Sequence, residues 1–315
     1  MYQGNSNRIF GLRLKNKMGR MKTLFLSRVR ERRSLALAVT LVSLVVVARP
    51  TEPSPVRTQG PAPVDVARWK SIALTFDDGP KPYVLVGRKS QNGVSSPSLL
   101  ELLDREGVKT TFFVMGFRLA DSANEFCRGI DVGINCRQAA EEVHRRGHEI
   151  ENHTHGHGAF SRMAKRYGEE WILSDIDRAS RIIQSVTGVR PQYVRPPDGD
   201  IWKGLLKKIE SRGYHVMTKS QRNIAEAPAL EDVDSQDYLY SLQDSSKSPV
   251  TTERNYVLNR IQQRERKGVY THVLVFHELP ISVEVLSTLI PELKKRGYVF
   301  QTLREYMKMP GAAAK

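Results

Sequence analysis

Beyond Trp69, short apolar runs alternate with stretches of helical periodicity, and this alternation constrains the fold of the 315-residue chain more than any other feature. Strands separated by helices predict a parallel sheet, and six or seven such units over about 235 residues are the size of a (β/α) barrel. The predicted strands are Ser71–Asp77, Lys109–Val114, Glu149–Thr154, Gln192–Arg195, Tyr214–Thr218, His272–His277 and Tyr298–Leu303. The predicted helices are 97–106, 137–146, 169–186, 202–212, 252–267 and 282–296.

The N-terminus has the pattern of a targeting element. Residues 8–33 carry ten Lys and Arg against the single acid Glu31, and residues 34–48 carry no charge. A basic flank followed by an apolar run of this length is typical of a signal peptide or a short signal anchor. Because the basic side stays in the cytoplasm, we expect the rest of the chain to be exported, to the periplasm, the cell surface or the medium. If the segment is not cleaved, it also anchors the chain in the membrane.

A composition break divides the chain further. Residues 49–68 contain five prolines and no apolar periodicity, so they predict a linker after the N-terminal segment 1–48. We therefore expect a single folded domain at 69–305 and a flexible tail at 306–315.

The distribution of charge bears on partners. The first 50 residues hold 11 of the 49 Lys and Arg but only one of the 34 acids, so the rest of the chain is only slightly basic. A nucleic-acid-binding tail in front of a buried apolar helix is the alternative to an export signal. Since the folded domain carries little excess positive charge, we expect no nucleic acid as a partner.

Four polar clusters follow predicted strands. They are TFDDGP (75–80), HTHGH (153–157), RPPDGD (195–200) and FHE (276–278). The carboxyl ends of parallel strands share one face of a barrel, where the connecting loops build the active site. Clusters that are far apart in the sequence are therefore expected to meet in space.

Two of these clusters suggest a metal site. His153 and His157 are four residues apart and would face one side if the chain turned into a helix there, although a fortuitous surface cluster gives the same pattern. Asp77 and Asp78 at the end of a buried strand need a cation or a shared proton unless they only form a turn. One carboxylate and two neutral imidazoles make a three-ligand divalent site with open positions, which leaves the other carboxylate as a base.

These motifs, together with the strand ending in VLVFHELP, resemble the polysaccharide deacetylase family, also known as the NodB homology domain or carbohydrate esterase family four. The resemblance covers about residues 71–303. It implies a distorted (β/α) barrel with seven parallel strands rather than eight, and one divalent metal, usually zinc, with Co²⁺, Ni²⁺ or Mn²⁺ as alternatives. The implied activity is removal of N- or O-acetyl groups from polymeric sugars, so the expected partner is an acetylated glycan such as peptidoglycan or chitin.

By position, the resemblance implies roles for seven residues: Asp77 as catalytic base, Arg195 as its arginine partner, His277 as catalytic acid, Asp78, His153 and His157 as metal ligands, and the backbone N–H of Asp198 as an oxyanion donor. In that mechanism the metal acidifies a water and polarises the acetyl carbonyl, the base takes the proton, and the acid protonates the departing amine.

The sequence also departs from the family pattern. Asp198 stands where an aromatic residue is usual. The fourth motif, an Asp followed after two residues by Asp-Trp, is expected near 217–225 but is not found there. In the family its Asp supports the arginine and tunes the acid, so Glu226 or Asp198 would have to replace it beside Arg195 and His277. A carbohydrate-binding pseudoenzyme of the same fold is therefore an alternative to an enzyme.

Two weaker features remain. Cys127 and Cys136 are the only cysteines, and in an exported protein they predict a disulfide rather than free thiols. The polar stretch 231–255 is long for a connection in a barrel, so we expect either a substrate-side loop or a mobile one. Its Tyr238 and Tyr240 would either stack on sugar rings or anchor the loop.

Overall fold

The computed structural model describes residues 70–87, 96–120, 135–219, 229–231, 233–240 and 249–309, all within one compact unit, Pro61–Lys315. The predicted N-terminal segment and linker, residues 1–68, lie outside the described residues. Of the helices in the described ranges, none is long and apolar enough to cross a membrane.

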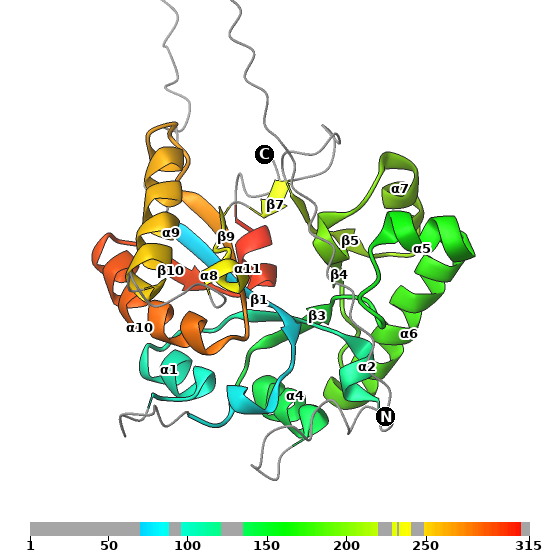
Figure 1. The fold of residues 1–315 in the computed structure, drawn as a ribbon, viewed down its shortest axis with the longest axis horizontal. Helices are drawn as coiled ribbons and strands as arrows, with labels where there is room; N and C mark the ends of the chain where they lie inside the picture. Colours follow the sequence, from blue (N-terminus) through cyan, green and yellow to red (C-terminus); the bar gives the residue numbers. More distant parts are fainter. Residues whose placement is uncertain are drawn as a thin grey trace, which may run out of the picture. The chain divides into compact units, whose positions relative to one another are not determined.

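The unit is built on a parallel sheet in the order β5-β4-β3-β2-β1-β9-β8, with β10 paired to β1 (Figure 1). Its strands are β1 Ser71–Gly79, β2 Thr111–Val114, β3 Glu149–Asn152, β4 Tyr193–Val194, β5 His215–Val216, β8 Val233–Asp234, β9 Thr271–His277 and β10 Val299–Gln301. A separate two-stranded sheet joins β6 Thr218–Lys219 to β7 Ala229–Glu231. All seven predicted strands are present, and β8 is an additional strand from the stretch expected to be a loop. The predicted distorted (β/α) barrel is confirmed.

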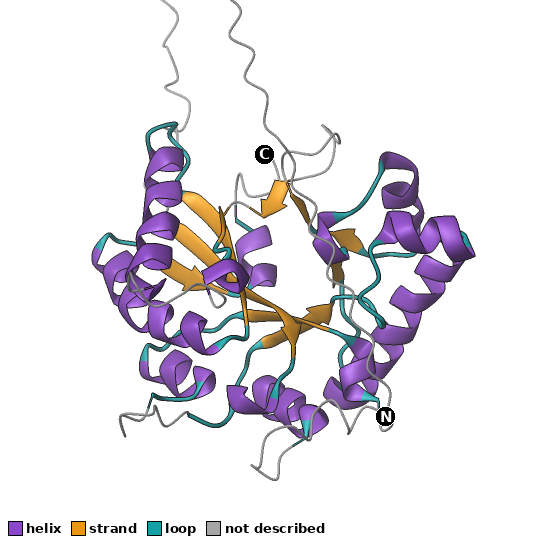
Figure 2. Cartoon of the chain, in the orientation of Figure 1, coloured by secondary structure: helices purple, strands orange, loops and turns teal. Residues whose placement is uncertain are grey.

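Helices surround the strands (Figure 2). The six predicted helices correspond to α1 Leu99–Arg105, α4 Cys136–Arg145, α6 Glu169–Thr187, α7 Lys203–Ser211, α9 Pro249–Glu265 and α10 Pro280–Lys295. Four short helices were not predicted: α2 Gly116–Leu119, α5 Phe160–Tyr167, α8 Asp237–Tyr240 and α11 Leu303–Met307. The sequence sets helix starts locally, as at α1, where Ser98 and Glu101 form a capping box.

The central strand β1 determines the geometry of the site. One edge of β1 pairs with β9, and the other edge pairs with β10 near its start and with β2 near its end. The register sets Asp77 opposite His277. Because side chains alternate across a strand, Ile72, Leu74 and Phe76 point to one face and Asp77 to the other.

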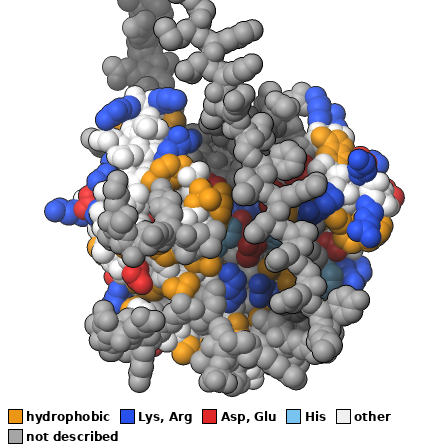
Figure 3. Space-filling model, viewed as in Figure 1, with side chains coloured by type: hydrophobic (Ala, Val, Ile, Leu, Met, Phe, Trp, Pro, Cys, Tyr) orange, Lys and Arg blue, Asp and Glu red, His pale blue; other side chains and the backbone are white. Residues whose placement is uncertain are grey.

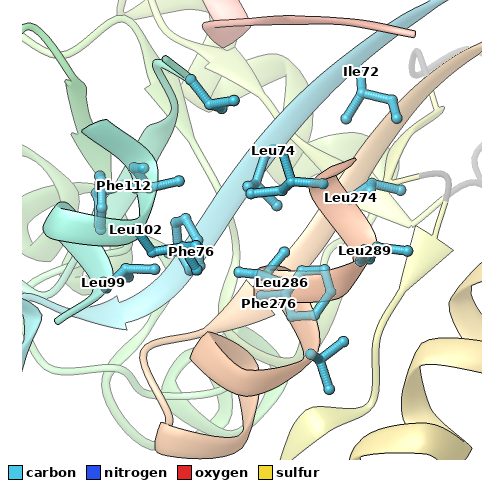
Figure 4. Close-up of a cluster of buried hydrophobic side chains, with 14 of the residues drawn as sticks. Ile72, Leu74, Phe76, Leu99, Leu102, Phe112, Leu274, Phe276, Leu286 and Leu289 are labelled. Atoms are coloured by element: carbon cyan, nitrogen blue, oxygen red, sulfur yellow. The ribbon is translucent and has the colours of Figure 1, made fainter. Parts of the chain in front are cut away.

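The larger hydrophobic cluster lies on the face of β1 that carries Phe76, against α1, α9 and α10 (Figure 4). The rings of Phe76 and Phe112 stack with their centroids 5.0 Å apart. Phe276 of β9 packs beside them, close to Leu286 and Leu289 of α10. Burying side chains of this size stabilises the fold by about 1.5–3 kcal/mol each, so β1 and β9 are fixed side by side.

A smaller cluster fills the interior of the barrel: Ala73, Phe113, Tyr193, Met217, Val273, Leu303 and Tyr306. Two of its members come from α11, whose start is capped by Thr302 and Glu305. Arg304 of the same helix donates to the fully buried Glu151 at 2.7 Å. Since α11 closes the interior, the packed structure extends to Met307, beyond the predicted domain boundary at 305.

Candidate active site

Asp77, the predicted base, is buried in a charge pair with Arg195. Its Oδ1 accepts a hydrogen bond of 2.6 Å from Arg195 Nη1, which also donates to Thr75 Oγ1 at 3.0 Å. The guanidinium lies over the ring of Phe113, 3.9 Å from its centroid. Asp77 Oδ2 is 4.0 Å from His153 Nε2. The pair therefore fixes one carboxylate oxygen of Asp77 and leaves the other facing the predicted metal site.

The three predicted metal ligands come together. Asp78 Oδ1 lies 3.3 Å from His153 Nε2 and 3.0 Å from His157 Nε2, and the three ligand atoms lie within 4.8 Å of one another. Burial alone would raise the pKa of Asp78, but its contacts with His153 and His157 lower it well below the usual range. The carboxylate is therefore ionised and available to a cation.

The orientation of His153 supports a cation at this point. Its Nδ1 lies 2.8 Å from the carbonyl oxygen of Arg195. A carbonyl oxygen can only accept a hydrogen bond, so Nδ1 carries a proton, and Nε2 is the ring nitrogen that faces Asp78 Oδ1. Nε2 lies 3.3 Å from Asp78 Oδ1, so a cation bound by this carboxylate would also be within reach of the ring. This is the way metal-bound histidines are oriented, so the donor set fits a divalent metal.

The four-residue spacing of His153 and His157 suggested a helix, but the structure has no helix at this point. Residues 153–159 form a loop after β3, in which Thr154 and His157 have positive φ angles of 67° and 52°. The hydroxyl of Thr154 accepts a hydrogen bond from the His157 backbone N–H at 3.0 Å, and the two imidazoles meet with centroids 4.9 Å apart. His155 points elsewhere and packs against Gly116.

Backbone strain gathers at the site. The described non-glycine residues with positive φ are Asp78, Thr154, His157, Asp198 and Gln236. Three are predicted site residues, and the other two are direct neighbours of site residues. Left-handed conformations are costly for residues with a Cβ and persist where the surrounding structure imposes them. The concentration of such residues here supports a functional site.

His277, the predicted acid, is held by Asp237. Its Nδ1 lies 2.7 Å from Asp237 Oδ1, and its backbone N–H donates to Asp237 Oδ2 at 2.6 Å. Ser282 Oγ donates to the same Oδ2 at 2.6 Å, and Asp237 is fully buried. Burial lowers the pKa of His277, but the hydrogen bond and charge of Asp237, with smaller contributions from Asp77 and Asp78, raise it to about 9. A histidine protonated at neutral pH is suited to donate a proton.

Asp237 is the site residue that the sequence analysis missed. The expectation that the fourth motif is lost is wrong: residues 234–238 read Asp-Ser-Gln-Asp-Tyr, an Asp followed after two residues by Asp and an aromatic. The motif lies beyond the expected position at 217–225, in β8 and α8, and brings Asp237 to His277. Of the suggested substitutes, Glu226 lies outside the described residues. Residues 234–238 themselves were the sequence signal that could have identified Asp237.

The predicted site residues line one pocket of about 310 Å³. Figure 3 shows acidic, basic and histidine side chains side by side in the middle of this face. The lining residues are Asp77, Asp78, Lys81, His153, His157, Arg195, Pro196, Asp198, Gly199, Met217, Asp234, Tyr238, Val275, His277 and Leu279. Tyr238 meets the His277 ring edge-on at 5.5 Å and is 42% exposed, so it offers a face to a ligand.

Two predicted features stay predictions. Cys136 is disulfide-bonded and buried at the start of α4, whereas Cys127, its predicted partner, lies outside the described residues. The side chain of Tyr240 is also outside the described part of the chain.

Comparison with known proteins agrees with this geometry. A family model described as polysaccharide deacetylase matches residues 66–217. A peptidoglycan-N-acetylglucosamine deacetylase of Bacillus cereus is 26% identical over 243 residues, covering 76% of this chain and 89% of that protein. Chitin deacetylase 1 of Cryptococcus neoformans is 28% identical over 128 residues, 41% of this chain and 21% of that protein.

A solved structure shows the same fold. The polysaccharide deacetylase Bc1974 from Bacillus cereus superposes with a TM-score of 0.53 at 23% identity, covering 76% of this chain and 95% of that one. The family match spans β1 to β5, which carry three of the four polar clusters, and the fold places the fourth cluster beside them. The chain therefore matches the polysaccharide deacetylase family in sequence over these strands and in fold.

Proposed function

We propose that this chain is a metal-dependent hydrolase that removes N-acetyl groups from an aminosugar polymer. The observation that carries the proposal is the closeness of three groups in one pocket. The ligand set Asp78, His153 and His157 lies 4.0 Å from Asp77, which pairs with an arginine, and 4.0 Å from His277, which pairs with a carboxylate. Amide hydrolysis needs a base for water on one side and an acid for the amine on the other.

The ligand set would hold one divalent cation. A carboxylate and two imidazoles with open positions suit catalytic zinc, and Co²⁺, Ni²⁺ or Mn²⁺ are alternatives. When bound, the cation supplies positive charge that polarises the acetyl carbonyl and acidifies a water molecule.

The remaining steps belong to residues of the chain. Asp77 accepts the proton of the attacking water at Oδ2, because Oδ1 is bonded to Arg195. The backbone N–H of Asp198 donates to the oxyanion of the tetrahedral intermediate. His277 donates a proton from Nε2 to the departing amine, since its Nδ1 faces Asp237. The C–N bond then breaks, and acetate and a free amino sugar leave.

The substrate class follows from the family and from the N-terminus. Acetylated peptidoglycan and chitin-like glycans are the polymers that we propose, since the relatives described above are named for them. The basic and apolar pattern of residues 8–48 would take the chain out of the cytoplasm to such a polymer, with or without retention as an anchor.

Acetate release tests the proposal. The purified full chain is treated with chelator, reloaded with Zn²⁺ or Co²⁺, and incubated with N-acetylated chitooligosaccharides and with peptidoglycan. We expect metal-dependent release of acetate from at least one polymer. His153→Ala should lose metal and activity, whereas His155→Ala, which removes an imidazole from the same loop outside the pocket, should keep both.

A non-catalytic carbohydrate-binding protein is the competing function. It was suggested by the apparent loss of the fourth motif, and Asp237 removes that reason. Glycan binding without acetate release under every metal condition would favour it and refute the proposed hydrolase.

A further inference from the structure

Lys81 occupies an unusual place in the pocket wall. It directly follows TFDDGP and lines the same pocket as the metal ligands and Tyr238. Arg195, the arginine of the lining, donates to Asp77 and Thr75 through Nη1. Lys81 is a basic lining residue outside the pair formed with the proposed base.

The position of Lys81 is fixed by Glu278. The Lys81 backbone N–H donates to Glu278 Oε2 at 2.6 Å, and its Nζ lies 3.4 Å from the backbone oxygen of Glu278. The same carboxyl packs so closely on Gly79 that a Cβ there would lie 1.7 Å from Oε1. A side chain at 79 would displace the Glu278 carboxyl group, through which the loop carrying Lys81 is tied to the strand end that carries His277.

Burial and nearby carboxylates act on Lys81 in opposite directions. Burial lowers the pKa of Lys81, and the charges of Glu278, Asp78 and Asp237 oppose that effect. Lys81 lines the same pocket as Tyr238, whose side chain is 42% exposed. An aromatic face suits a sugar ring, and a neighbouring ammonium suits a negative substituent on that sugar.

We propose that Lys81 is a specificity-determining residue that binds a carboxylate on the glycan, so that this enzyme prefers a carboxylate-bearing aminosugar polymer to a neutral one. The inference rests on the proposed deacetylase function and names the substrate class for it. The carboxylate can belong to the lactyl ether of muramic acid or to a uronic acid, because both present the same group to an ammonium.

The test compares substrates that differ only in charge. The full chain loaded with zinc is assayed on glycan strands freed of stem peptides, whose lactyl groups are carboxylates, and on the same strands with these groups converted to methyl amides. Oligosaccharides that alternate N-acetylglucosamine with uronic acid form a second pair with their methyl amides. A higher kcat/KM on the charged member of both pairs indicates a general carboxylate subsite. A higher value in only one pair identifies which sugar carries the recognised carboxylate.

We expect kcat/KM to be about tenfold higher on the carboxylate strands, the size of one charge-assisted hydrogen bond. Lys81→Gln should bring the ratio close to one by raising KM on the charged strands, Lys81→Arg should keep it, and high salt should reduce it. The matched control is Lys109→Gln. It removes the same charge just before β2, where Lys109 pairs with Asp104 at 3.2 Å, and should leave the ratio unchanged.

A wild-type ratio near one, or an equal loss on charged and neutral strands in Lys81→Gln, would overturn the assignment. Absence of acetate release from every substrate would instead contradict the proposed function. In that event the dissociation constants of charged and neutral strands, measured by calorimetry for wild type and Lys81→Gln, still decide whether Lys81 recognises the carboxylate.

Discussion

Replacing Asp237 with Asn tests the arrangement of the proposed acid. The substitution keeps the shape of the side chain but removes the negative charge that faces His277 Nδ1 at 2.7 Å. That carboxylate contributes most of the increase in the His277 pKa from 6.5 to about 9, against the opposing effect of burial. The whole increase corresponds to about 3 kcal/mol in favour of the protonated ring.

The magnitude follows from the fraction of protonated acid. A general acid works in its protonated form, so activity is lost as the pH rises through its pKa. With a pKa of about 9, most His277 is protonated at pH 8. If the pKa returns to its ordinary value, only about 3% is protonated, which predicts a loss in kcat/KM of about thirtyfold at pH 8 and little loss near pH 5.5.

The assay is the pH profile of kcat/KM at equal metal loading, because a bound cation lowers the pKa of His277 in both proteins. We expect the alkaline limb of Asp237→Asn to lie about two pH units below that of the wild type. Asp234→Asn removes another carboxylate of the same motif, one that does not bond to His277. The alkaline limb of its pH profile should therefore move much less. An alkaline limb that stays in place in Asp237→Asn would refute the reasoning.

Two other predictions concern carboxylates. Asp77→Asn should keep its metal and lose activity by about 10²–10⁴-fold, whereas Asp78→Asn should lose metal affinity and recover part of its activity at high zinc. Measurement of bound metal and acetate release checks both, and a metal-free Asp77→Asn beside a metal-replete Asp78→Asn would mean that the roles are reversed. Glu253 is fully buried, and its oxygens have no hydrogen-bond partner among the described residues. Burial first and then the charge of Asp237 raise its pKa from 4.5 to about 8. An acid with a raised pKa in the folded state makes the protein less stable as the pH rises from 4.5 to 8, so Glu253→Gln should be more stable than wild type by up to about 4 kcal/mol at pH 8 and nearly equal at pH 5. Urea unfolding at the two pH values measures this, with the exposed Glu284→Gln as control, and an equal difference at both values would contradict it.

Much of the fold was predictable because its signals are local. Apolar runs such as Ser71–Asp77 identify strands, and their alternation with helices restricts the sheet to parallel pairing. Parallel strands present their carboxyl ends on one face, so polar motifs at those ends had to converge. Asp77, His153 and His277 lie at one face because the strands are parallel and because each residue stands at or close to the end of its strand.

The partner of His277 could not be predicted in the same way. Asp237 comes from the two-residue strand β8 and the four-residue helix α8, which are too short to produce a hydrophobic period. Its 40-residue separation from His277 is closed only by the pairing of β8 with β9. The polar stretch 231–255 has no hydrophobic period, so it was predicted to be a loop. Its Asp237 is nevertheless fully buried.

The sequence by itself determined which residue types end the strands, and therefore that a base, an acid and metal ligands share one face. Only the tertiary structure decided the tautomer of His153, through the carbonyl of Arg195, and the charge of His277, through Asp237. It also buried Glu253 and set Lys81 in the pocket wall. These properties depend on burial and on partners distant in the chain, and local sequence patterns carry no information about either.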